Sequence, residues 1–192
     1  MKSRVLWALA ALFLLTAPSG QALAGPALDT LKVAVDEVLV ILKTPVNTPG
    51  RADKLSDAVR GVFDPEELAR RTLATHWKSF NQGEQVRFTD AFVKLLERTY
   101  LRRIETYTNA QVVYVSESPL GNNQAEVSTK IIAAQEVPIV YRLINKNGWK
   151  VYDVVIEGVS LVQNYRNQFN QILVSQSPAQ LISRIESMSQ AQ

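Results

Sequence analysis

Apolar residues recur every three or four positions through much of the chain between residues 27 and 106, which is the spacing of one face of an α-helix. Asp64 followed by Pro65 has the pattern of an N-cap and a first helical residue, and Asn81 with Glu84 has that of a capping box. These signals mark where two of the helices begin. The segments predicted to be helical are residues 27–43, 53–60, 65–77 and 82–106.

The hydrophobic period changes from 3.6 to 2 after residue 110, which is typical of strands with one buried face. Asn147 followed by Gly148 is a strong hairpin signal, and two more helices are expected to begin at Leu161 and Pro178. The order of elements predicts one α+β domain, in which helices cover one face of a twisted antiparallel sheet of about four strands. The predicted strands are residues 111–117, 125–131, 137–143 and 149–157, with a turn over 119–123.

The first 24 residues have the composition of a secretory signal peptide. Lys2 and Arg4 precede an uncharged, mostly apolar run of about a dozen residues, and Ala22 and Ala24 frame a small-x-small cleavage pattern. Such a run is shorter than the roughly 20 residues that cross a bilayer. We therefore expect residues 1–24 to be a cleaved signal peptide and residues 25–192 to form the exported domain. The absence of cysteine excludes disulfides and a lipid anchor at the cleavage site.

The charge balance at first suggests a nucleic-acid binder, because the net charge is +3 and the pI is about 9.2. Lys2 and Arg4 supply two of the 21 basic residues and none of the 18 acidic ones, so the exported part carries 19 basic residues against 18 acidic ones. Adjacent basic residues occur only in two pairs within predicted helices, and no concentrated basic surface is expected. We therefore expect no nucleic-acid partner.

Groups suited to catalysis are scarce. The chain has one histidine, His76, no cysteine, no glycine-rich phosphate loop and no cluster with metal-ligand spacing. Asp153 is the best candidate for a general base in a pocket, but an aspartate at this place more often accepts hydrogen bonds from backbone donors at a strand end. We expect no catalytic residue, no metal and no cofactor, and keep an enzyme that uses Asp153 as the alternative.

The inward faces of the predicted elements offer a set of large apolar and aromatic side chains, and the pattern leaves open whether they line a cavity or form solid core. The candidates for binding an apolar ligand are Phe88, Phe92, Leu96, Tyr100, Val127, Ile131, Ile139, Tyr141, Leu143, Val154, Ile156, Tyr165 and Phe169.

Two runs of the sequence carry a resemblance to a known family. They are GVFDPEELARRTLATHWKSFNQGEQVRFTDAFVKLLERTY (61–100) and YDVVIEGVSLVQNYRNQF (152–169). They resemble the toluene-tolerance family of MlaC-type periplasmic phospholipid-binding proteins of Gram-negative bacteria, and the order of elements matches over the whole exported chain. The chain departs from the family at Leu73-Ala74, where the family often has Leu-Gly; this departure bears on the local turn geometry.

The resemblance implies a monomeric periplasmic carrier with an NTF2-like cone and an apolar cavity, which holds the tails of a diacyl phospholipid and leaves its headgroup in water. It implies exchange between an outer-membrane lipoprotein–porin complex and an inner-membrane ABC transporter with an MCE-type ring subunit, which maintains the lipid asymmetry of the outer membrane. Exposing roughly 30 methylenes to water would cost about 24 kcal/mol, so such a cavity must replace most of the contacts that the bilayer provides. The alternatives are an NTF2-like enzyme with Asp153 as its base, and an envelope adaptor that binds no lipid.

Overall fold

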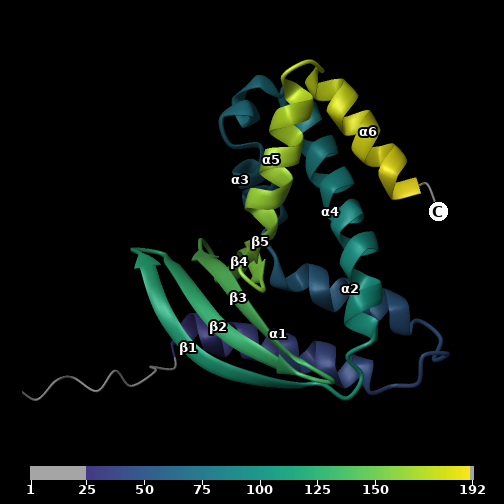
Figure 1. Cartoon of the computed structure of the whole chain (residues 1–192), viewed down its shortest axis with the longest axis vertical. Helices are drawn as coiled ribbons and strands as arrows, with labels where there is room; N and C mark the ends of the chain where they lie inside the picture. Colours follow the sequence, from purple (N-terminus) through teal and green to yellow (C-terminus); the bar gives the residue numbers. More distant parts are fainter. Residues whose placement is uncertain (1–24, 191–192) are drawn as a thin grey trace, which may run out of the picture.

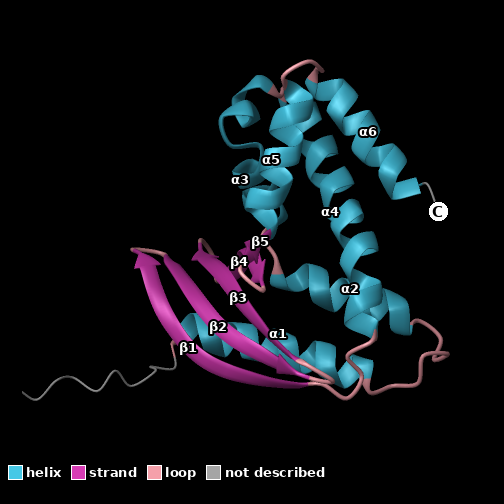
Figure 2. Cartoon of the chain, in the orientation of Figure 1, coloured by secondary structure: helices cyan, strands magenta, loops and turns pink. Residues whose placement is uncertain are grey.

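The computed structural model describes residues 25–190, so the predicted signal peptide, residues 1–24, lies outside the described residues. Helices and strands follow one another in the order expected from the sequence (Figures 1 and 2). None of the helices in residues 25–190 is long and apolar enough to cross a membrane. The helices are α1 (Pro26–Leu42), α2 (Arg51–Val62), α3 (Pro65–Leu73), the 3₁₀ helix η1 (Ala74–Ser79), α4 (Gln82–Glu105), α5 (Leu161–Leu173) and α6 (Pro178–Gln190). The strands are β1 (Gln111–Gly121), β2 (Gln124–Ile132), β3 (Glu136–Asn145), β4 (Trp149–Ile156) and β5 (Val159–Ser160).

Side-chain caps begin the helices where the sequence predicts them. The carboxylate of Asp64 accepts a hydrogen bond of 2.9 Å from the backbone N–H of Glu67, at the start of α3. Asn81 and Glu84 form the complete capping box of α4, with both side-chain-to-backbone bonds 3.0 Å long. These short-range bonds satisfy N–H groups that have no partner inside the helix, which is why local sequence fixes the helix starts.

Two boundaries differ from the sequence-based expectation by more than two residues. The helix expected over 65–77 ends as an α-helix at Leu73, because Ala74 has a φ of +50° and cannot continue it; η1 follows instead. The turn expected over 119–123 is shorter, since β1 continues to Gly121 and pairs there with Gln124 of β2.

The strands form one antiparallel meander in the order β1-β2-β3-β4-β5, which confirms the predicted α+β fold class. The two-residue strand β5 is added to the four that the sequence predicts. A bulge in the β3–β4 pairing places Leu143 opposite Val151 and Arg142 opposite Asp153. The first pair faces α1 and is buried, whereas the second lies on the other face of the sheet.

Buried apolar side chains form two clusters at opposite ends of the molecule. One lies among α3, α4, α5 and α6, and the other lies between the N-terminal half of α1 and one face of the sheet. Helix α4 runs from the first cluster to the part of the molecule where α1, α2 and the sheet meet (Figure 1). The space between the two clusters is bounded by the lower half of α4.

A buried carboxylate fastens α3 to the sheet. Glu67 is 2% exposed and accepts hydrogen bonds from Arg70 and Arg71 on its own helix, and it pairs at 3.2 Å with Lys146 of the β3–β4 turn. Burial alone would raise the pKa of Glu67, but the hydrogen bonds from these three cations outweigh it and lower the pKa to about 2. Glu67 is therefore ionised at neutral pH and joins the helical cluster to the hairpin.

Candidate functional site

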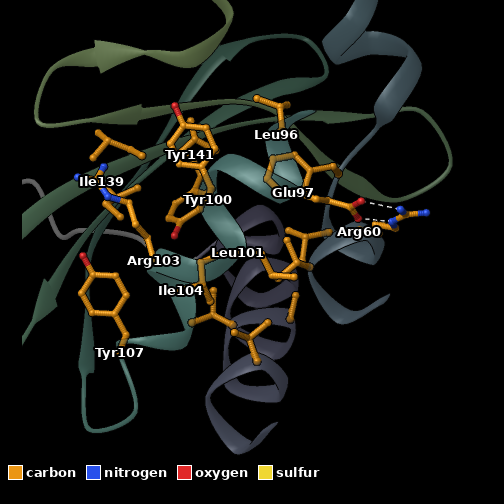
Figure 3. A pocket seen from close by; sticks show the side chains of 18 of the residues that line it. Arg60, Leu96, Glu97, Tyr100, Leu101, Arg103, Ile104, Tyr107, Ile139 and Tyr141 are labelled. Atoms are coloured by element: carbon orange, nitrogen blue, oxygen red, sulfur yellow. Dashed lines mark hydrogen bonds and ion pairs between the residues drawn. The ribbon is translucent and has the colours of Figure 1, made fainter. Parts of the chain in front are cut away.

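An apolar cavity of about 270 Å³ lies between α1, α2, the lower half of α4 and the facing side of the sheet (Figure 3). Its volume is close to the lower end of the range for small-molecule pockets. Most of its wall consists of aliphatic and aromatic side chains. The lining residues are Leu31, Ala34, Val35, Val38, Leu39, Leu42, Val59, Arg60, Val62, Phe63, Pro65, Leu68, Val93, Leu96, Glu97, Tyr100, Leu101, Arg103, Ile104, Tyr107, Ala110, Val112, Ile131, Val137, Ile139, Tyr141, Val154, Ile156 and Leu161.

Helix α4 supplies both solid core and cavity wall from one continuous apolar stripe. Phe88 and Phe92, in its upper half, are 0% and 1% exposed and pack into the helical cluster. One and two turns further on, Leu96 and Tyr100 still contact that cluster but also line the cavity. Ile104, one turn later still, lines the cavity and does not contact the cluster. The change occurs because the helices that cover the upper half of the stripe no longer cover the lower half.

Helix α1 forms the opposite wall. Ala27 and Leu31, in its first half, are buried against the sheet, whereas Val38 and Leu39 belong to neither buried cluster and line the cavity. Both of these side chains are half-buried, although they are large and apolar. A helix with such side chains on its inner face leaves apolar surface without a protein partner, and that surface is available to an apolar ligand.

Seven of the thirteen candidate residues identified from the sequence lie in the cavity wall. They come from α4, β2, β3 and β4, which the fold brings together around one space. These residues are Leu96, Tyr100, Ile131, Ile139, Tyr141, Val154 and Ile156.

The remaining six candidates lie outside the cavity wall, in packed core. Phe88, Phe92, Tyr165 and Phe169 form an aromatic cluster with neighbouring ring centroids 5.1–5.7 Å apart, enclosed by α3, α4, α5 and α6. Val127 and Leu143 are 0% and 1% exposed in the cluster beneath α1. All six pack against other protein side chains, and none of them lines the cavity.

Sequence reasoning did not identify the contributions of α1, α2 and the last turns of α4 to the wall. The clearest missed residues are Val35, Val38, Leu101, Ile104 and Tyr107. The apolar stripe of α1 was visible in the sequence, but a stripe does not indicate whether protein or ligand covers it. The one available signal was the length of the α4 stripe, which continues beyond the helices that pack on it.

The polar groups of the wall are few. Burial raises the pKa of Tyr141 to about 12, so its ring presents a neutral hydroxyl at physiological pH. Arg60 of α2 and Glu97 of α4 form a two-fold ion pair, one contact of which is 2.6 Å, and the hydroxyl of Ser56 also donates to Glu97 at 3.1 Å. The side-chain hydrogen bond to Glu97 raises the pKa of Arg60. Each of these two charges therefore neutralises the other (Figure 3).

Asp153 lies on the face of the sheet that points away from the cavity. Its carboxylate accepts hydrogen bonds from the Ser160 hydroxyl at 2.7 Å, the backbone N–H of Val162 at 3.0 Å and the Arg142 guanidinium at 3.2 Å. The first two donors belong to the start of α5, so Asp153 caps that helix. This is the structural role that the sequence allowed, and it gives the aspartate no access to a ligand in the cavity.

The wall offers little for chemistry. Glu97 is the only carboxylate among the described lining residues, and it is engaged by Arg60 and Ser56. No group of three or more histidine, cysteine, aspartate or glutamate side chains within residues 25–190 is placed to hold a metal ion. The arrangement is suited to binding an apolar molecule.

Comparison with known proteins gives consistent results. The family model described as MlaC protein matches residues 32–187. The intermembrane phospholipid transport system binding protein MlaC of Haemophilus influenzae is 32% identical over 128 residues, which cover 63% of this chain. The match spans 60% of that relative, less than two thirds of its length. The solved structure of a phospholipid-binding protein from Ralstonia solanacearum, in complex with a phospholipid, is similar with a TM-score of 0.78 and 26% identity, over 86% of this chain and 97% of that one.

Proposed function

Because the chain belongs to the MlaC family, we propose that it is a phospholipid carrier that holds acyl chains in the cavity between α1, α4 and the sheet. The headgroup stays at the solvent-exposed end of the cavity, and no covalent chemistry takes place. The relative from Haemophilus influenzae, named for intermembrane phospholipid transport, and the phospholipid-bound neighbour from Ralstonia solanacearum support this proposal.

The observation that carries the proposal is that the cavity wall is apolar and only partly covered by protein. Its side chains include valine, leucine, isoleucine and tyrosine from nine elements, and most are half-buried without being covered by protein. Exposed to water, such a concave apolar surface is unfavourable by about 25 cal/mol per Å². Acyl chains would cover it and would themselves be shielded from water, so burial of both apolar surfaces lowers the free energy of the complex.

Loading a diacyl lipid requires the cavity to enlarge, because its present volume of about 270 Å³ is small even for a drug-sized ligand. Polar contacts connect α2 to α4 on one side of the cavity. Arg60 and Ser56 of α2 bind Glu97 of α4, and Arg51 of α2 pairs with Glu105 of α4 at 3.3 Å. Polar contacts of this kind re-form with water more readily than a packed apolar core does. We place the expansion at this wall.

The cellular setting is also part of the proposal. A signal peptide over residues 1–24 directs the chain to the periplasm, and residues 25–192 form a monomeric carrier that diffuses between the membranes. Its partners are an inner-membrane ABC transporter with an MCE-type ring subunit and an outer-membrane lipoprotein–porin complex. The near balance of 19 basic and 18 acidic residues in the exported part fits a protein that approaches anionic membranes without adsorbing to them.

The direct test expresses the 192-residue sequence in a Gram-negative host and isolates the protein from the periplasm without detergent. Native mass spectrometry is expected to detect a chain that begins at Gly25 with a diacyl phospholipid bound. After delipidation, the protein is expected to take up phosphatidylcholine from vesicles. A protein that is empty as purified and takes up no lipid from vesicles contradicts the carrier proposal.

Two valines of α1 provide a matched pair of variants. Val38 lines the cavity, whereas Val40, two residues away on the same helix, is 64% exposed outside it. Val38→Glu places a carboxylate among the acyl chains, and neutralising it at pH 7 costs about 3–4 kcal/mol, so uptake should fall more than about 100-fold. Val40→Glu should leave uptake unchanged. Equal uptake by two folded variants would place the lipid elsewhere.

A further inference from the structure

One positive charge of the cavity wall is not neutralised by the protein. The charged lining residues among those described are Arg60, Glu97 and Arg103, and the first two form an ion pair with each other. The guanidinium of Arg103 has no carboxylate partner and no hydrogen-bond acceptor within residues 25–190. An apolar cavity with one unbalanced cation on its rim is matched to a ligand that is apolar with a single anionic group.

Arg103 lies where the cavity meets solvent. It belongs to the last turn of α4, is exposed, and still forms part of the cavity wall. In Figure 3 it lies on the side of the drawn residues away from the Arg60–Glu97 pair, as Tyr107 does. The aliphatic part of an arginine side chain packs on apolar surface while its guanidinium remains in water, which is the placement that a lipid headgroup region requires.

The neighbouring arginine, Arg102, does not border the cavity. Arg102 is also exposed in the last turn of α4, but it lines a surface groove with Glu105 and Glu186 on another side of the helix. Two adjacent arginines therefore have the same helical setting, and only Arg103 borders the cavity.

We propose that Arg103 binds the phosphodiester of the lipid whose acyl chains occupy the cavity, and that it makes the protein select phosphate-bearing lipids over neutral diacylglycerol. This inference rests on the proposed carrier function. A guanidinium can donate two parallel hydrogen bonds to phosphate oxygens, and it keeps its charge at every physiological pH. Tyr107, also in the wall, offers a hydroxyl at the same end of the cavity.

The expected selectivity is modest, because Arg103 is exposed and solvent screens its charge. Loss of the contact should lower the preference for phospholipid about 3- to 10-fold. The acyl chains remain bound through apolar contacts, so total loading should change little.

The test uses vesicles of dioleoylphosphatidylcholine that contain a minor fraction of dioleoylglycerol. Both lipids have the same tails and are taken from the same membrane, so a change in their ratio between variants reports the headgroup contact. Delipidated protein is incubated with the vesicles and separated from them, and its bound lipids are quantified by mass spectrometry. Arg103→Gln should lower the phosphatidylcholine-to-diacylglycerol ratio about 3- to 10-fold, Arg103→Lys should restore part of it, and the matched control Arg102→Gln should leave it unchanged.

The outcomes separate the inference from the function on which it rests. If the wild-type protein takes up neither lipid, the carrier proposal fails. If Arg103→Gln takes up lipid with the wild-type ratio, or if Arg102→Gln lowers the ratio equally, the assignment to Arg103 is overturned. Repeating the measurement with inorganic phosphate replacing chloride at equal ionic strength distinguishes the two sources of phosphate. An unchanged ratio supports headgroup binding, and loss of the preference would show that Arg103 binds free phosphate instead.

Discussion

Removal of the buried charge at Glu67 is the sharpest stability test of this fold. Glu67→Gln keeps the length and nearly the volume of the side chain, so it changes little except the charge. It leaves Arg70, Arg71 and Lys146 facing a neutral amide, whose N–H₂ group cannot accept their hydrogen bonds. Glu66, the preceding residue of α3, is exposed, and Glu66→Gln makes the same charge change as a matched control.

The size of the effect follows from the pKa of Glu67. Its ordinary value is 4.5 and its value in the folded protein is about 2, a difference of about 2.5 units at about 1.4 kcal/mol each. Arg70 and Lys146 are about half exposed, so screening reduces the effect, and we expect a loss of about 2–3 kcal/mol at pH 7. For a domain of this size, that lowers the melting temperature by roughly 4–12 °C. Glu66→Gln should cost less than about 0.5 kcal/mol.

The assay is urea unfolding followed by circular dichroism at a series of pH values. Because the pKa of Glu67 is lower in the folded state than in the unfolded state, its carboxylate stabilises the fold fully above pH 4.5. This contribution is lost as the pH falls from 4.5 through about 2. The difference between wild type and Glu67→Gln should therefore be constant near neutral pH and fall by about half near pH 3.

Two results would refute this reasoning. The ion-pair network would not stabilise the fold if Glu67→Gln and Glu66→Gln unfolded at the same urea concentration. The pKa of Glu67 would not be lowered if the difference in stability persisted unchanged below pH 4. Lipid uptake at 25 °C should be unaffected in both variants while they remain folded, because neither residue lines the cavity.

Two further predictions test the division between structural and ligand-facing residues, and a third tests the backbone strain at Ala74. Asp153→Asn should cost about 1–2 kcal/mol, because an amide cannot accept all the bonds that the carboxylate accepts, and it should leave lipid uptake unchanged. Glu126→Gln, which changes the more exposed carboxylate partner of the same arginine, should cost less than about 1 kcal/mol. Lost uptake in folded Asp153→Asn protein would contradict a purely structural role for Asp153. Phe92→Ala should cost about 3–5 kcal/mol in urea unfolding and Leu96→Ala no more than about 2, and equal costs would contradict the boundary between core and cavity on α4. Ala74→Gly should stabilise the protein by about 1 kcal/mol, because Ala74 has a φ of +50° that glycine adopts without strain, and an unchanged or lower melting temperature would contradict this.

Much of the fold follows from short-range chemistry and could be predicted from the sequence. The caps at Asp64, Asn81 and Ser160 involve residues three positions apart, so each helix start is encoded locally. The alternation along β2, with Val127 and Thr129 buried and Ser128 between them half-buried, is likewise a local property of a strand with one covered face. The resemblance to the MlaC family was also carried by contiguous runs of sequence, and the family match confirms it.

The functional surface depended on contacts that sequence does not reveal. Phe92 and Leu96 are one helical turn apart on the same stripe, yet one is packed core and the other lines a cavity. The difference arises from which distant elements cover each turn of α4. The same holds for Arg102 and Arg103, which the sequence cannot distinguish and of which only one borders the cavity.

The sequence by itself therefore determined the elements, the fold class and the family of this protein, because periodicity and capping act over a few residues. Only the tertiary structure decided where apolar side chains pack against one another and where they line a cavity. A hydrophobic stripe has the same spacing in both cases, and whether it is filled by protein or left for a ligand depends on packing between segments far apart in the chain.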